Sequence, residues 1–141
     1  MPSVEPTPER YKAFQSEVDT PGPVVMINLI RFRDTAEYAA GFEAEPCTGR
    51  EAYKRYSALA FPQIQSVDGR MVFFGQVQAT VIAPDGEEWD EAFLVEYPSR
   101  AVMLEVLSRP EYRAIIPHRT AALLDSRLIA VQPSGSRSDE A

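Results

Sequence analysis

The chain has 141 residues, enough for one domain with a hydrophobic core and too few for two domains of ordinary size. Its 45% hydrophobic and 25% charged content is that of a soluble globular protein, and no apolar run approaches the roughly 20 residues that cross a bilayer. The formal net charge of -7 argues against a nucleic-acid-binding surface, because phosphate recognition normally needs a positive patch. The start, MPSVEPTPER, does not resemble a secretory signal, so we expect a cytoplasmic protein with no membrane contact.

A single cysteine and a single histidine limit the chemistry that the chain can carry. Cys47 has no second cysteine for a disulfide, and together with His118 it does not form a recognisable metal-ligand set. Neither a glycine-rich phosphate loop nor a GxSxG motif occurs. We therefore expect no metal site and no cofactor.

The first part of the chain predicts a helix followed by a strand. TPERYKAFQSEV predicts a short helix with Thr7 as its N-cap and Pro8 at its first position. DTPGP breaks this helix, and VVMINLIRFRD, residues 24–34, predicts a buried strand. Residues 35–48 have no clear periodicity and are expected to form a loop with one helical turn at most.

A second helix is predicted over residues 50–67. Thr48 and Glu51 have the spacing of a capping box, and Tyr53 and Tyr56 begin an apolar stripe along the helix. Pro62 is expected to kink or end it.

The second half of the sequence predicts two strands, a broken helix and a final strand. The strands 70–83 and 89–99 are expected to pair antiparallel around the turn PDGEE. A helix over 100–108 capped by Ser99, and a helix over 110–124 kinked at Pro117, precede the last strand, 126–133.

The resulting order of elements predicts an α+β, ferredoxin-like domain, a four-stranded antiparallel sheet with helices on one face. We divide the chain into an N-terminal helical extension, the ferredoxin-like domain and a disordered tail, at residues 1–21, 22–133 and 134–141.

Apolar residues occur on both faces of the predicted strands. In the first strand Met26 and Ile30 lie on one side, and Ile27 and Leu29 on the other. An uncovered face of this kind exceeds what soluble monomers usually expose. We therefore expect a homodimer in which the two sheets pack face to face; the alternative is that the leading helix or the 35–48 loop covers that face.

Four segments carry a resemblance to a known family: GPVVMINLIRFR, GREAYKRYSALAFP, WDEAFLVEYPSR and RPEYRAIIPHRTAALLDSRLIA. Over roughly residues 22–133 the chain resembles the DUF1330 family, small bacterial proteins of the dimeric α/β barrel superfamily. The resemblance implies a ferredoxin-like subunit and a homodimeric barrel. It implies no reaction and no catalytic residues.

Three residues are candidates for catalysis. Asn28 shares a strand face with Met26, so its amide either bonds to neighbouring backbone or points into a pocket and orients a ligand. Glu96 would have a raised pKa and act as a general base if buried without a cation, whereas an arginine partner would remove that role. His118, the only histidine, is a candidate for proton transfer at a pocket mouth.

Ligand contacts are expected from Asn28, Tyr56, Gln76 and Arg119. Tyr56 lies on the apolar stripe of its helix, which also suits a core role, and Gln76 is a candidate member of the same polar cluster. Arg119 suits a ligand carboxylate or a helix cap. Arg31 and Arg33 are expected to pair with Glu91, Glu96 or a carboxylate of a second copy.

These observations favour a homodimer that binds or transforms a small organic molecule in a metal-free pocket between sheet and helices. A non-catalytic dimeric binding or interaction protein is the first alternative. The second is a cofactor-free or heme-degrading monooxygenase that uses Asn28, Trp89 and His118, because members of the wider superfamily use these residue types. Whether the protein is an enzyme stays open at this point.

Overall fold

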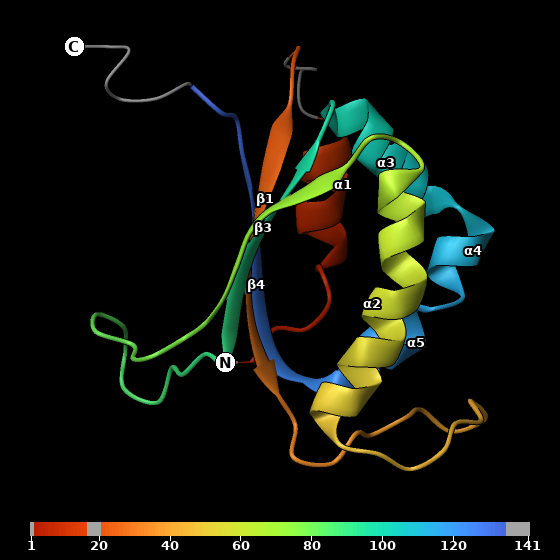
Figure 1. Cartoon of the computed structure of the whole chain (residues 1–141), viewed down its shortest axis with the longest axis vertical. Coiled ribbons are helices and arrows are strands. Elements are labelled where there is room, and N and C mark those ends of the chain that lie inside the picture. The colour runs from red at the N-terminus through yellow and green to blue at the C-terminus, as the bar shows by residue number, and fades with distance from the viewer. Residues whose placement is uncertain (1, 17–20, 135–141) are drawn as a thin grey trace.

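The computed structural model describes residues 2–16 and 21–134. Its four-stranded antiparallel sheet has the order β2-β3-β1-β4, and all labelled helices lie on one side of it (Figure 1). This arrangement confirms the ferredoxin-like α+β fold. The elements are α1 Pro8–Ser16, β1 Val24–Phe32, α2 Gly49–Gln65, β2 Arg70–Gln76, β3 Glu91–Tyr97, α3 Arg100–Ser108, α4 Pro110–Arg113, α5 Ile116–Ala122 and β4 Leu123–Val131.

Helix α2 begins as its sequence predicts. The Thr48 hydroxyl accepts a hydrogen bond from the Glu51 backbone N–H, and the Glu51 carboxylate accepts one from the Thr48 N–H at 2.9 Å, which confirms the capping box. A Cβ at Gly49 would lie 2.2 Å from the Arg33 carbonyl oxygen, so only glycine lets α2 begin directly against the end of β1. Pro62 does not end the helix, which continues to Gln65.

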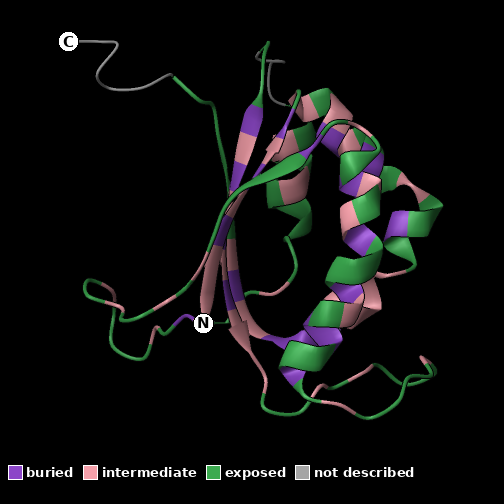
Figure 2. Cartoon of the chain, viewed as in Figure 1, coloured by how far each residue is buried: buried purple, intermediate pink, exposed green. Residues whose placement is uncertain are grey.

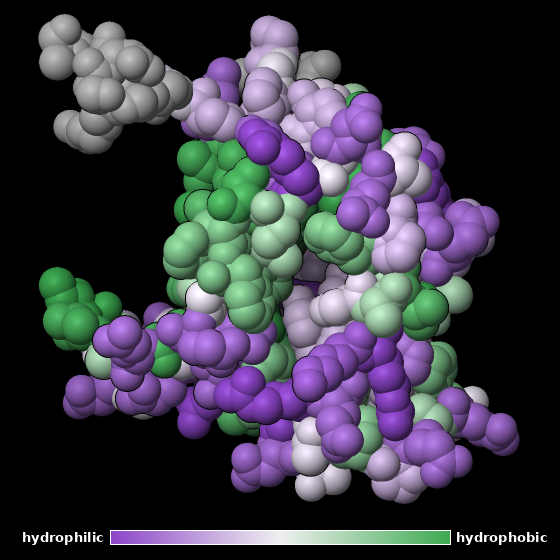
Figure 3. Space-filling view, in the orientation of Figure 1, coloured by the Kyte–Doolittle hydropathy of each residue, from purple (hydrophilic) through white to green (hydrophobic). Residues whose placement is uncertain are grey.

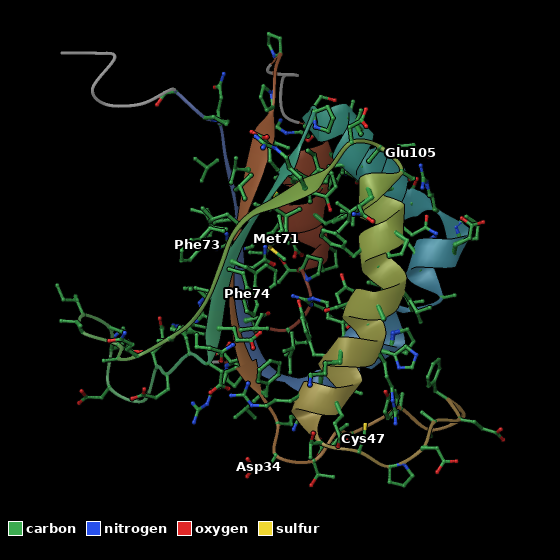
Figure 4. All side chains as sticks on the ribbon, viewed as in Figure 1. Asp34, Cys47, Met71, Phe73, Phe74 and Glu105 are labelled. Atoms are coloured by element: carbon green, nitrogen blue, oxygen red, sulfur yellow. The ribbon has the colours of Figure 1, made fainter. Side chains whose placement is uncertain are left out.

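The connection between β2 and β3 differs from the predicted tight hairpin. The two strands do pair antiparallel, but β2 ends at Gln76 and residues 77–90 form a long loop. An irregularity in register between Met71 and Phe73 shifts the alternation of side chains. Met71 and Phe74 therefore face the helices while Phe73 faces away from them (Figure 4), although strict alternation along a strand would place Met71 and Phe73 on the same face.

The segment between β3 and β4 contains three short helices. Ser99 caps α3 by accepting a hydrogen bond from the Val102 N–H, as predicted. The predicted broken helix forms α4 and α5, which are separated at Ala114 and Ile115 just before Pro117. The break turns α5 toward α2, and the two helices lie in contact.

The buried residues lie between the sheet and the helices, whereas the 35–48 and 77–90 loops are mostly exposed or intermediate (Figure 2). The largest fully buried side chains come from β1, α3 and β4: Ile30, Val106 and Leu123. The other side of the sheet, here called the outer face, is apolar as well. By register it carries Val25, Ile27, Leu29, Phe73, Leu94 and Val131.

Neither segment expected as a possible intramolecular cover lies on the outer face. Helix α1 packs on the helix side, where Phe14 contacts the core. The 35–48 loop lies against α5 through Tyr38 and His118, which are hydrogen-bonded at 2.7 Å. Of the chain's other segments, the 77–90 loop contacts this face at Arg127, which lies opposite Leu29 and packs on Trp89.

The predicted end of the first helix and most of the predicted tail fall on residues 17–20 and 135–141, outside the described residues. None of the helices in the described part has the length and apolar character needed to span a membrane.

Candidate functional site

A cavity of about 1570 Å³ lies between the sheet and the helices. The space-filling view shows the surface hollowed at this place, between an apolar region over the sheet and the helical layer (Figure 3). Met26 and Val95 of the sheet form one apolar wall, and Ile64 and Met103 of the helices form the other. The cavity is therefore a largely apolar space that opens to solvent.

Four polar side chains from three helices meet in the cavity wall. Tyr53 and Tyr56 lie one turn apart on α2, Tyr112 comes from α4 and Arg119 from α5. The hydroxyls of Tyr56 and Tyr112 are hydrogen-bonded to each other. The Arg119 guanidinium donates to the Val4 carbonyl oxygen at 2.6 Å and lies close enough to the Tyr53 hydroxyl to act on its pKa.

The three phenols of this group remain protonated at neutral pH. Burial, the largest cause, raises the pKa of Tyr53, Tyr56 and Tyr112, and the nearby Arg119 charge only partly opposes it. The group therefore presents neutral hydroxyls beside one permanent positive charge.

Asn28 lies in the sheet wall of the same cavity and is 8% exposed. Alternation along β1 places it opposite Phe93 of β3 and Leu128 of β4. Its Nδ2 donates to the Met26 carbonyl oxygen at 3.1 Å. The Asn28 side chain makes no other hydrogen bond to the described residues. Its Oδ1 can therefore accept a hydrogen bond from a ligand.

A second polar group forms the cavity wall near the end of β2. Gln76 donates from Nε2 to Glu91 at 2.9 Å, and Arg50 of α2 lies 3.6 Å from the same carboxylate oxygen. The Arg50 guanidinium also lies over the Phe32 ring. These contacts hold Gln76 in place and link α2 to the edge of the sheet.

All four predicted ligand-contact residues, Asn28, Tyr56, Gln76 and Arg119, thus line one cavity.

Glu96 does not belong to this site. It follows Leu94 by two residues on β3, so it lies on the outer face, and Arg70 binds it at 2.8 Å. An arginine partner is the condition that removes the general-base role. The expected pairing of Arg31 and Arg33 with Glu91 or Glu96 is also wrong within the chain, because Arg31 donates to the Gly86 carbonyl oxygen and Arg33 pairs with Glu37.

His118 likewise lies outside the cavity. Its ring hydrogen-bonds to the Tyr38 hydroxyl and packs edge-on against the stacked rings of Tyr38 and Phe42. Burial and, to a smaller degree, the Arg55 charge lower the pKa of His118. In this position the histidine anchors the 35–48 loop on α5.

Trp89 is also separate from the cavity lining. It lies before β3, where its Nε1 donates to Glu87 and the Arg127 guanidinium lies 5.0 Å from its ring centre. Asn28, Trp89 and His118 are therefore not brought together, and the monooxygenase interpretation loses the residue set on which it depended.

Two polar residues of the site, Tyr53 and Tyr112, were not among the predicted site residues. The spacing of Tyr53 and Tyr56 places both on one side of α2, which was a usable signal. Tyr112 had no such signal, because its approach to Tyr56 depends on the break between α4 and α5. Within the described residues no group of three or more His, Cys, Asp or Glu side chains is arranged to hold a metal ion.

Comparisons with known proteins give a family and a fold. The model of DUF1330, described as a domain of unknown function, matches residues 42–132. The structure of RPA0582, a protein of unknown function from Rhodopseudomonas palustris, is similar with 37% identity and a TM-score of 0.87, over 96% of this chain and 100% of that chain. The structure of methylated RPA0582 has 38% identity and a TM-score of 0.87, over 95% of this chain and 96% of that chain.

More distant structures share only the fold. A protein of unknown function from Bacteroides fragilis, described as dimeric and ferredoxin-like, has 15% identity and a TM-score of 0.50, over 79% of this chain and 96% of that one. A NIPSNAP domain protein from Burkholderia xenovorans has 15% identity and a TM-score of 0.51, over 79% of this chain and 94% of that chain. No curated protein matches the sequence.

Proposed function

Because the chain belongs to the DUF1330 family, whose domain has no assigned function, we propose its role from its own cavity: the protein is a homodimer that binds a small organic molecule between the sheet and helices of each subunit. The observation that carries the proposal is the cavity of about 1570 Å³, apolar over most of its wall, with Asn28, Arg119 and the tyrosines exposed to it. Ligand sites in proteins have this composition, a mostly apolar wall with a few fixed polar groups.

The chemistry of these polar groups favours binding over proton transfer. The phenols are protonated, the guanidinium is permanently charged and the Asn28 amide does not titrate. The two titratable candidates, Glu96 and His118, lie outside the cavity. Binding is therefore the function that this set of side chains supports best.

The dimer is supported by the outer face. Phe73 is 56% exposed there, on the side opposite the helices, and its neighbours Ile27 and Leu94 are also apolar. The 77–90 loop projects to the same side (Figure 1), and its residues Val81 and Ile82 are 88% and 94% exposed. A second copy on this face would bury all of these side chains, and the similar fold from Bacteroides fragilis is described as dimeric.

A matched pair of α2 variants tests the cavity. Ser57 is an exposed residue of the cavity wall, whereas the adjacent Ala58 is exposed but outside the wall. Ser57→Trp should narrow the cavity and Ala58→Trp should not. We expect the wild type and Ala58→Trp to enhance the fluorescence of 8-anilino-1-naphthalenesulfonate, and Ser57→Trp to do so much less.

Native mass spectrometry of the same samples reports the assembly and any bound molecule. The proposal predicts a dimer, and a co-purified ligand would appear as extra mass that disappears on denaturation. Equal dye fluorescence in both tryptophan variants would contradict the cavity, and a monomeric wild type would contradict the dimer.

A further inference from the structure

The cavity carries charge of the opposite sign to the whole chain. The formal net charge is -7, from 14 basic and 21 acidic residues. Among the described residues, the cavity lining includes six of the basic side chains and two of the acidic ones, Glu5 and Glu91. The basic side chains are Arg10, Arg50, Lys54, Arg113, Arg119 and Arg127. An acidic protein thus concentrates positive charge around this largely apolar cavity, which favours an anionic ligand.

Two of these cations already have carboxylate partners. Arg127 binds Asp125 at 2.7 Å and Glu87 at 3.3 Å, and Arg50 lies between Asp90 and Glu91. Their charges are largely balanced within the protein, so they contribute to the shape of the cavity more than to its potential.

Arg119 differs from these two arginines. It donates to a neutral group, the Val4 carbonyl oxygen, it lies near the neutral Tyr53 hydroxyl, and no described carboxylate forms an ion pair with it. The neighbouring phenols of Tyr56 and Tyr112 are neutral too. The guanidinium is therefore a positive charge inside a half-buried site without an internal counterion, a state that an anionic ligand group would stabilise.

The surroundings of Arg119 restrict the kind of anion. The guanidinium is a planar fork that matches a carboxylate, and the neighbouring tyrosine hydroxyls add further neutral donors. Beyond this group the wall consists of apolar side chains such as Met26, Ile64 and Met103. A ligand that matches both the Arg119 group and the apolar wall has one carboxylate and an apolar body.

We propose that the cavity binds small organic acids, with the carboxylate at Arg119 and the tyrosine hydroxyls and the apolar body between the sheet and α2. This inference rests on the proposed function, since it requires the cavity to be a ligand site, and it adds the chemical class of the ligand.

The test compares acids with their neutral amides. Isothermal titration of the full chain would use octanoate with octanamide, and 3-phenylpropanoate with 3-phenylpropanamide, at low ionic strength. We expect each acid to bind at least about tenfold more tightly than its amide, the usual scale for a charge-assisted hydrogen bond. Arg119→Gln should remove most of this preference, because it weakens binding of the acid by about tenfold and binding of the amide much less.

Two further variants control for charge and for folding. Arg113→Gln removes one positive charge from an exposed position of the cavity lining, so it should reduce acid binding by about twofold or less. Arg119→Lys keeps the charge without the planar fork and should retain part of the preference. Measurable binding of the amide shows in each variant that the cavity is still formed.

The possible failures are distinguishable. If acid and amide bind the wild type equally, the cavity stands and the organic-acid inference is wrong. If Arg113→Gln reduces the preference as much as Arg119→Gln, the general charge of the cavity and not the Arg119 site selects the acid, which also overturns the inference. If neither acids nor amides bind and the dye test of the cavity is negative, the proposed function itself is wrong.

Discussion

At the scale of the single residue, His118 illustrates how a histidine can be structural although it is the only one in the chain. Its ring is enclosed by Tyr38 and Phe42, and Arg55 donates to the same Tyr38 hydroxyl at 3.2 Å. The cation and the burial both disfavour a second proton on the imidazole. The environment therefore favours the neutral imidazole, which is the form that holds the 35–48 loop through Tyr38.

This environment predicts a pH dependence of stability. The folded-state pKa of His118 lies below its usual value of 6.5, so the unfolded chain binds the proton more readily. The free energy of unfolding should fall as the pH drops through about 6.5 toward the lowered folded-state pKa, and this stability is fully present above the unfolded value. His118→Phe keeps an aromatic ring without titrating and should show a smaller decrease over the same range.

An NMR titration of the single histidine measures the shift directly. The midpoint should lie below 6.5 in the wild type and rise in Arg55→Gln, without reaching 6.5, because burial is the larger cause. A midpoint at or above 6.5 in the wild type would show that the ring is not enclosed as described.

At the scale of the element, local signals predicted the helix starts correctly. Thr48 and Ser99 cap α2 and α3 because a cap depends on residues three positions apart, which the sequence displays directly. The irregular register near Met71 and the early end of β2 had no such local signal. Both depend on pairing with β3, and the sequence of β2 alone continues as a strand through apolar residues such as Val81.

The capping box of α2 gives a prediction at this scale. Thr48→Ala removes the side-chain acceptor for the Glu51 N–H and should lower the free energy of unfolding by about 1 kcal/mol. Thr48→Ser keeps the hydroxyl and should change it by only a few tenths of that amount. Urea unfolding followed by circular dichroism measures both, and equal losses in the two variants would mean that the hydroxyl does not stabilise the helix.

At the scale of the whole molecule, the fold was more predictable from sequence than the site. The order of strands and helices predicted the ferredoxin-like topology, and alternation placed Asn28 on the same strand face as Met26, without indicating that this face is the one covered by the helices. Alternation did not reveal which partners that side would meet. Tyr112 and Arg119 reach the same cavity because the chain breaks between α4 and α5. Pro117 indicated a kink in this segment, but the approach of Tyr112 to Tyr56 of α2 is a long-range packing result that no local pattern reports.

The outer face gives the prediction that belongs to the whole molecule. Phe73 and Leu59 are similarly exposed in the single chain, at 56% and 50%, but Phe73 lies on the outer face and Leu59 lies on α2. If two sheets pack face to face, Phe73→Glu places a charge within the interface and should convert the dimer to a monomer, because an unpaired buried charge is strongly unfavourable.

Leu59→Glu adds the same charge at a comparable exposure and should leave the dimer intact. Sedimentation equilibrium of both variants and the wild type measures the change. Dissociation by Leu59→Glu, with no effect from Phe73→Glu, would move the interface from the sheet to the helices. In that arrangement the apolar outer face would still lack a cover, so the two variants together decide which surface a second copy uses.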